Sequence, residues 1–331
     1  MTSAEDDRRR AAIRPVKRRH EDTLLDLPGV VAVDIGAQTT GGVRTGRPAI
    51  VVSVRVKRPA VTVAHGQLLP AEIDGVPVDV IEEDVLLHPA LLRADAAPER
   101  SGESYPALVG GISVGPCRSI QMVPPQAPEP GEYVTVGTLG LLVAARADRR
   151  RVFGLTNFHI ACVDDAWAVG DAMTHPSRVD GGRCPQDIVG SLASSALSGS
   201  VDAALIALTP ERAWRREIAQ LGRPGGCARA LLGSLVRKRG RTTGLTQGVV
   251  VSTDVTLCLD YGDSLGRRRL RDQIRVTTAE GVFGDRGDSG AVLVDPDNQV
   301  VGLHCAGTLG GGSGFANPIN RVLDELDVVL A

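Results

Sequence analysis

Short apolar segments, separated by clusters of glycine, proline, aspartate and serine, follow one another from about Ala107 to about Ala316. Apolar runs of a few residues that are bounded by turn residues predict strands, and many of them at short spacing predict an antiparallel β-barrel or sandwich. The strands predicted in this way cover residues 139–144, 152–155, 188–192, 203–208, 248–252, 274–277, 291–294 and 300–304.

A smaller strand-rich domain is predicted before this region, over residues 23–88. Apolar and polar side chains alternate between residues 50 and 57, and this period of two predicts a half-buried strand. Asp74-Gly75 predicts a hairpin turn between two further strands, and Pro77 after it indicates an edge position. No catalytic motif is found in this domain.

Two segments show no apolar periodicity. Residues 1–22 are rich in arginine and predict a disordered basic arm, for which contact with nucleic acid or lipid headgroups is the alternative. Residues 89–106 are rich in alanine, arginine, proline and glutamate, and this composition predicts a linker to a catalytic domain over residues 107–331.

An amphipathic helix is predicted at the C-terminal end. Asn317 is the expected N-cap and Pro318 lies in the first turn. The apolar positions then repeat with helical spacing, at Ile319, Val322, Leu323 and Leu326.

Composition and charge restrict the function. The 331 residues suffice for about two domains, and the net charge of −2 gives the whole chain no electrostatic reason to hold nucleic acid or an anionic membrane. No run approaches the ~18 apolar residues of a membrane helix. The first 25 residues are charged where a signal peptide is apolar, so a cytoplasmic location is predicted.

The chain has six cysteines and no Cys-x-x-Cys pair. In a reducing compartment free buried thiols are expected, and three disulfides are the alternative for a secreted chain. Cys162, His175 and Cys184 have the residue types of a zinc site without a known spacing. We therefore expect neither a metal nor a cofactor.

Three residues beside predicted strands carry candidate catalytic chemistry. Ser289 lies between glycines on a tight loop before an apolar run, His159 follows an apolar strand, and Asp202 opens another. The order His, Asp, Ser differs from that of the α/β-hydrolases and of the subtilisin-like enzymes.

From about Val109 to the C-terminus the chain resembles the trypsin/chymotrypsin-like serine peptidases. Gly287-Asp288-Ser289-Gly290 matches the serine loop of that family, and residues 156–161 match its histidine segment. Residues 137–143, 170–171, 180–182 and 239–248 are similar to a bacterial intracellular subgroup with an N-terminal extension, and to the plant narrow-leaf type protease. The resemblance implies a mainly β fold: a chymotrypsin-like double β-barrel with a C-terminal helix, preceded by a small α+β domain.

The implied function is a serine endopeptidase acting on a protein or peptide substrate. Ser289 would attack the carbonyl and form an acyl-enzyme, His159 would act as general base and acid, and Asp202 would orient His159. The backbone N–H groups of Gly287 and Ser289 would form the oxyanion hole.

The resemblance also assigns roles near the serine. Phe283 would lie at the base of the substrate pocket, with His304, Cys305 and Ala306 along its wall; because none is acidic, small or apolar residues are expected before the cleaved bond, not Lys or Arg. A cation is expected beside Asp288, from the group Lys238, Arg239 and Arg241.

Several alternatives stay open. Asp164, Asp165, Asp180 and Asp187 also follow the histidine, and Phe158 and Ala291 depart from the usual family pattern. The same fold can serve as a catalytically weak or inactive binding or assembly module, and an esterase is a third reading. The N-terminal domain is the candidate surface for a homo-oligomer.

Overall fold

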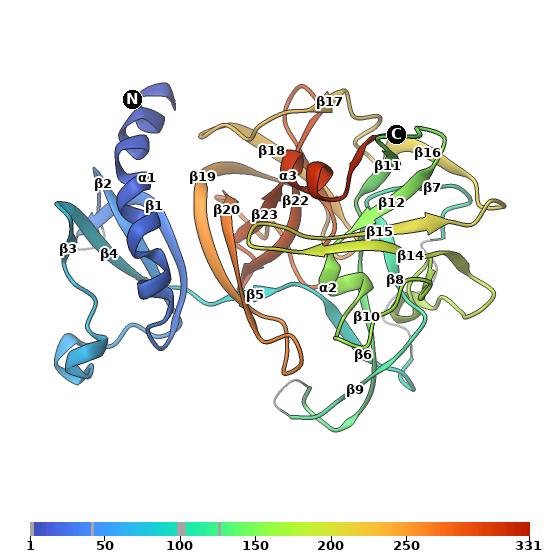
Figure 1. Ribbon diagram of the computed structural model, residues 1–331, viewed down its shortest axis with the longest axis horizontal. Helices are drawn as coiled ribbons and strands as arrows, with labels where there is room; N and C mark the ends of the chain where they lie inside the picture. Colours follow the sequence, from blue (N-terminus) through green and yellow to red (C-terminus); the bar gives the residue numbers. More distant parts are fainter. Residues whose placement is uncertain (1–2, 41–42, 98–103, 125–126) are drawn as a thin grey trace.

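Two antiparallel β-barrels form most of the molecule, and a helix with a small group of strands lies beside the second barrel (Figure 1). The computed structural model describes residues 3–40, 43–97, 104–124 and 127–331. The predicted mainly β fold, a chymotrypsin-like double barrel with a short C-terminal helix, is confirmed.

The first barrel follows the strand order β11-β12-β15-β14-β13-β8-β10. It closes because β10 (Gly131–Leu139) continues into β11 (Leu141–Ala145), which divides the predicted 139–144 strand at Gly140. A Cβ at Gly140 would lie 2.3 Å from the carbonyl oxygen of Gly290, so glycine permits this close approach. The remaining strands are β8 (Ile112–Pro116), β12 (Val152–Thr156), β13 (Ala172–Thr174), β14 (Ile188–Leu197) and β15 (Asp202–Leu208).

The second barrel follows the order β18-β21-β22-β23-β20-β19 and closes through pairing of β18 with β19. Its apolar core includes Val236, Val250, Ile274, Phe283 and Leu293. The strands are β18 (Leu235–Gly240), β19 (Gly244–Asp260), β20 (Arg267–Thr277), β21 (Val292–Val294), β22 (Gln299–Thr308) and β23 (Ser313–Pro318).

The strand-rich N-terminal unit extends the sheet of the second barrel. β1 (Val30–Thr40) pairs with β19, and β2 (Val43–Val54), β4 (Val76–Glu82) and β3 (Glu72–Ile73) follow in that order. Asp74 and Gly75 have φ values of 47° and 78°, as a hairpin turn between β3 and β4 requires. The strand predicted over residues 50–57 ends at Val54, and its residues 50–54 are buried on both faces instead of half-buried.

The predicted disordered arm is wrong for the described residues, because α1 (Ser3–Leu25) is a helix that packs on β1 and β2. Lys17 on this helix is buried and Arg14 is half-buried, whereas several other arginines of the helix stay exposed. Lys17 Nζ donates to Glu21 Oε2 at 2.5 Å and to Thr256 Oγ1 at 2.7 Å. Arg14 Nε lies 2.5 Å from Asp254 Oδ1. Acidic partners far along the chain thus order a segment whose composition alone resembles a solvated tail. None of the described helices is apolar over enough of its length to span a membrane.

The chain between the N-terminal unit and the first barrel includes two short strands, β5 (Val85–Leu87) and β6 (Ala90–Arg93). β5 pairs with β22 of the second barrel, and β6 pairs with β10 of the first. Figure 1 shows this segment running across the junction of the two barrels. The predicted linker over residues 89–106 therefore begins as a paired strand, and its residues 98–103 lie outside the described part.

The C-terminal helix forms, although not with the predicted cap. α3 (Ile319–Glu325) begins after Pro318, while Asn317 belongs to β23 and its side chain makes no cap. β24 (Val328–Leu330) then pairs with β11. The short elements not yet mentioned are α2 (Phe158–Ala161), β7 (Leu108–Gly110), β9 (Ile120–Met122), β16 (Trp214–Ile218), β17 (Gly226–Cys227), η1 (Ala60–Thr62), η2 (His65–Gln67) and η3 (Arg178–Asp180).

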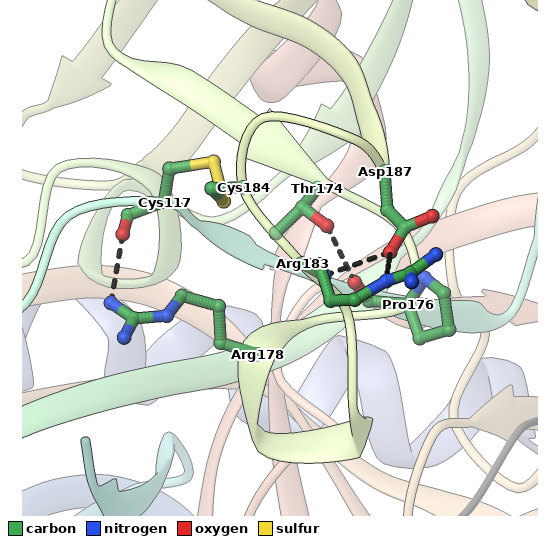
Figure 2. The surroundings of a disulfide bond; sticks show 7 residues. All are labelled: Cys117, Thr174, Pro176, Arg178, Arg183, Cys184 and Asp187. Atoms are coloured by element: carbon green, nitrogen blue, oxygen red, sulfur yellow. Dashed lines mark hydrogen bonds and ion pairs between the residues drawn. A yellow bond between two sulfur atoms is a disulfide. The ribbon is translucent and has the colours of Figure 1, made fainter. Parts of the chain in front are cut away.

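A disulfide joins Cys117, just after β8, to Cys184 in the loop before β14 (Figure 2). Arg178 donates to the carbonyl oxygen of Cys117 at 2.9 Å. The expectation of free thiols is therefore wrong for this pair and holds for Cys162, Cys227, Cys258 and Cys305. The cytoplasmic location stays a prediction, and this bond is the feature that argues against it, since disulfides persist mainly in oxidising compartments.

Candidate functional site

His159 and Asp202 meet on neighbouring strands of the first barrel. His159 lies on α2 directly after β12, and Asp202 is the first residue of β15, which pairs with β12. His159 Nδ1 is 2.6 Å from Asp202 Oδ2, and the His159 backbone N–H donates to Oδ1 at 3.2 Å. A carboxylate bonded to Nδ1 places the proton there, which leaves the lone pair of a neutral imidazole on Nε2. Nε2 is buried and has no hydrogen-bond partner within the described residues.

Asp202 is held by residues from both barrels. Tyr261, which follows β19, donates its hydroxyl to Asp202 Oδ2 at 2.7 Å. Burial and the Asp202 charge raise the pKa of Tyr261 well above its usual value, so the phenol keeps its proton. Asn317 Oδ1 accepts from the Asp202 backbone N–H at 3.0 Å, and Asn157 Nδ2 donates to the Asp202 carbonyl at 2.6 Å.

Ser289 comes from the second barrel, on the loop before β21. Its Oγ donates to the carbonyl oxygen of Cys305 at 3.2 Å, and Asn317 Nδ2 donates to the Cys305 sulfur at 3.5 Å. Asn317 thus contacts both the residue that holds Ser289 and the backbone of Asp202. Ser289 is fully buried and makes no hydrogen bond with His159 in this structure.

A buried ion pair fixes the loop that carries Ser289. Lys238 Nζ lies 2.8 Å from Asp288 Oδ2, and both side chains are fully buried. The Asp288 carboxylate also accepts from the backbone N–H of Thr242 at 2.8 Å and from Thr243 Oγ1 at 2.6 Å. Burial opposes ionisation of Asp288, but Lys238 and these donors outweigh it and lower its pKa to about 2. Of the three predicted cations, Lys238 takes this role; Arg241 pairs with Asp180.

Three of the four other candidate acids have different partners, and the fourth, Asp165, is exposed. Asp164 pairs with Arg118 at 2.5 Å, and Asp187 with Arg183 at 3.2 Å. Asp180 accepts from Arg241 Nε at 2.8 Å. These pairs leave Asp202 as the carboxylate that bonds to His159.

The predicted pocket residues lie on β22 of the second barrel and beside it. The ring centroids of Phe283 and His304 are 6.0 Å apart, and Ala306 follows Cys305 on β22. Burial, followed by the Lys238 charge, lowers the pKa of His304 well below its usual value, so its buried imidazole is neutral. Gly314 packs closely on these rings, because a Cβ there would lie 2.5 Å from the Phe283 ring.

Three residues of this site escaped the sequence analysis. Asn317 lies before Pro318 and has the pattern of a helix cap, while Tyr261 follows a strand in a turn and shows no motif at all. His88 lies before the predicted linker, yet its carbonyl oxygen accepts from the backbone N–H of Gly287 at 2.5 Å. Only the spatial meeting of distant strands reveals these contacts.

The chain is similar to known proteins in structure, but it matches no sequence family. No family model matches the chain, and no curated protein matches it. Solved structures similar to it include serine proteases of the chymotrypsin/trypsin fold. Protease A of Thermobifida fusca is 22% identical with a TM-score of 0.47, over 68% of this chain and 98% of that one. A Nocardiopsis protease is 19% identical with a TM-score of 0.47, over 67% and 97%. Cellulomonas bogoriensis chymotrypsin is 20% identical with a TM-score of 0.44, over 67% and 97%.

Proposed function

We propose that the protein is a serine endopeptidase in which Ser289, His159 and Asp202 carry the reaction. The observation that supports this most is the pairing of His159 Nδ1 with Asp202, because it leaves the basic Nε2 unbonded in the site that also contains the Ser289 loop. An alcohol needs such a base to attack a carbonyl at neutral pH.

In the proposed reaction Ser289 Oγ turns from the Cys305 carbonyl toward His159. Nε2 takes the hydroxyl proton as Oγ bonds to the substrate carbonyl carbon, and the imidazolium is stabilised by Asp202. The proton then passes to the leaving amine as the peptide C–N bond breaks. Water, deprotonated by the same nitrogen, hydrolyses the acyl-enzyme and restores Ser289.

The oxyanion of each tetrahedral intermediate would be bound by the backbone N–H groups of Gly287 and Ser289. Gly287 has a φ of +99°, a conformation that side chains with a Cβ rarely adopt, and its N–H donates outside the loop, to the His88 carbonyl oxygen. The Lys238–Asp288 pair next to it would hold that amide in place before the substrate arrives.

A binding or assembly module of the same fold is the second candidate. It is favoured by one observation: the Ser289 hydroxyl is fully buried and bonded to Cys305 instead of His159. In such a protein the site would bind a peptide without cleaving it.

A fluorophosphonate probe tests the proposal, because it reacts only with an activated serine. We expect one adduct per chain on long incubation, mapped to Ser289 by mass spectrometry and absent in Ser289→Ala. His159→Ala should label at least about 100-fold more slowly, as loss of a general base predicts. Ser234→Ala is the matched control and should label like the wild type, because Ser234 is half-buried and its hydroxyl donates to the Leu231 carbonyl. If the folded wild type and the folded opened variant described below both stay unlabelled, the binding module is favoured.

A further inference from the structure

The chain passes through its own candidate site at residues 85–93. β5 runs antiparallel to the end of β22, with Leu87 opposite Ala306 and Leu86 opposite Gly307. These β22 residues follow Cys305 directly, whose carbonyl holds the Ser289 hydroxyl. Addition of an extended peptide as a strand at a sheet edge is a common mode of peptide recognition.

The residue after β5 places its carbonyl at the proposed oxyanion donor. The Gly287 backbone N–H donates to the His88 carbonyl oxygen at 2.5 Å. A peptide bond that Ser289 attacks needs its carbonyl oxygen at this amide. Beyond Pro89 the segment is held again, because Ala90 pairs with Val136 on β10 of the first barrel.

The His88 side chain fills the predicted pocket. Its ring centroid is 5.5 Å from that of His304, and a Cβ at Gly307 would lie 2.1 Å from the His88 ring. The side chain is buried, and burial lowers the pKa of His88 to about 4, so a neutral ring occupies the pocket at neutral pH. Strand pairing, carbonyl and side chain therefore all match what a bound substrate requires.

Apart from His88, most of the segment lies near the surface of the cleft. Leu86, Leu87, Pro89 and Leu91 are only half-buried, and they line a cavity of about 570 Å³ together with His159 and Tyr261. A segment held by two short strand pairings over such a cavity can leave without unfolding either barrel.

We infer that residues 85–93 occupy the substrate cleft as an intramolecular, substrate-like peptide, with His88 at the position before the bond that Ser289 addresses. The inference rests on the proposed function and deepens it. The substrate class is an extended peptide with apolar residues before a neutral, flat side chain of imidazole size. The site is closed to other chains until the segment leaves.

The bond presented to Ser289 is His88–Pro89. Its cleavage would join Ser289 Oγ to the His88 carbonyl carbon, break the bond to the proline nitrogen, and move the Ser289 proton through His159 to that nitrogen. Pro89 supplies a ring-bound tertiary nitrogen, and pairing of β6 with β10 keeps this leaving group beside the acyl carbon. The segment consequently acts as an inhibitor of its own chain.

The test compares two double variants of the full chain. Leu87→Gly with His88→Gly removes the anchoring side chains, and Val61→Gly with Leu68→Gly makes the same kind of change at two exposed positions of the N-terminal unit. If the open form is a tenth of the population or less, the first variant should react with the fluorophosphonate at least about tenfold faster than wild type, and the control should not. Equal rates in variants with wild-type melting temperatures overturn the inference. His88→Ala, with the same readout, replaces the double variant if that one unfolds.

A second readout needs no catalysis. In the Ser289→Ala background, a fluorescent peptide with the sequence of residues 84–92 should bind the Leu87→Gly/His88→Gly protein in a polarisation assay, and bind neither Ser289→Ala alone nor the control. A peptide with lysine in place of His88 should bind about tenfold more weakly or worse. Binding without labelling supports the cleft inference and rejects the peptidase proposal. Labelling at equal rates with no peptide binding rejects the inference and leaves the peptidase proposal standing.

Discussion

Asp202 is the residue on which the donors of the site converge. The ring and backbone of His159 and the hydroxyl of Tyr261 share its two carboxylate oxygens. A carboxylate with these donors has one stable orientation, and it imposes one tautomer and one ring orientation on His159. The chemistry proposed for Ser289 depends on that orientation more than on any property of the serine itself.

Removal of the Tyr261 hydroxyl should weaken the base without removing it. A hydrogen bond to a charged group contributes about 1.5–3 kcal/mol, so Tyr261→Phe should slow labelling of Ser289 roughly 10- to 160-fold in the opened variant. Tyr133→Phe is the matched control, because its hydroxyl donates to the Glu129 carbonyl away from the site. An unchanged rate for Tyr261→Phe would show that His159 alone positions Asp202.

His88 gives the docked segment a pH dependence. Its pKa is about 4 when docked and about 6.5 in a released chain. The docked form therefore binds fewer protons, so docking is fully present above pH 6.5 and weakens as the pH falls toward 4. The charged and titratable groups around the ring act in both directions. Asp288 and Asp285 raise the pKa of His88, whereas Lys238 and His159 lower it. His88 and His304 are neighbours, and a charge on His88 lowers the pKa of His304.

Histidine NMR measures this directly. The His88 ring signal, assigned with His88→Asn, should titrate near pH 4 in the wild type and near 6.5 in a peptide of residues 84–92. A wild-type ring that titrates near 6.5 would mean that His88 does not rest in the pocket.

At the scale of elements, strand pairing holds the segment around His88 at the candidate site of its own chain. β5 and β6 are too short to be read from sequence, and each depends on an edge of a different barrel. Their pairing explains why the chain is ordered on both sides of His88, although the alanine- and proline-containing stretch after His88 resembles a linker.

Replacement of Pro89 tests what keeps the presented bond intact. Pro89→Ala converts the leaving nitrogen to an ordinary amide, and we expect slow self-cleavage after His88, seen as fragments 1–88 and 89–331 by intact mass. Ser289→Ala in the same background should prevent it, and Ala96→Gly, which lies after the segment, should leave the chain whole. An intact Pro89→Ala chain whose Ser289 still labels would show that strand pairing, and not the proline, protects the bond.

At the scale of the whole molecule, the N-terminal unit and the second barrel share one sheet. β1 pairs with β19, and α1 covers the apolar side chains of Val33, Ile35, Ile50 and Val52. Lys17 and Glu21 are buried under this contact, and both bond to Thr256 of β19. The unit is therefore part of the structural support of the site.

Deletion of α1 should expose that apolar surface. A chain that begins at residue 29 should melt at least about 5 °C lower than wild type and form larger particles by light scattering. Arg19→Gln, at an exposed position of the same helix, is the control. A truncated chain with wild-type stability and size would show that α1 does not stabilise the rest of the molecule. The same light-scattering measurement on the full chain gives its oligomeric state, and so tests the homo-oligomer predicted through this unit.

The sequence by itself determined the β-rich class, most of the barrel strands, and Ser289, His159 and Asp202 as candidates, because alternating burial and turn residues are local properties. It predicted a disordered arm, a linker and a helix cap where the structure has a packed helix, a strand across the cleft and Asn317 bonded to Asp202. Those outcomes depend on which partner a charged, polar or extended segment meets, and the partners lie far away in the chain. Only the tertiary structure brings Asp254 and Thr256 to α1, and β22 and Gly287 to the segment around His88.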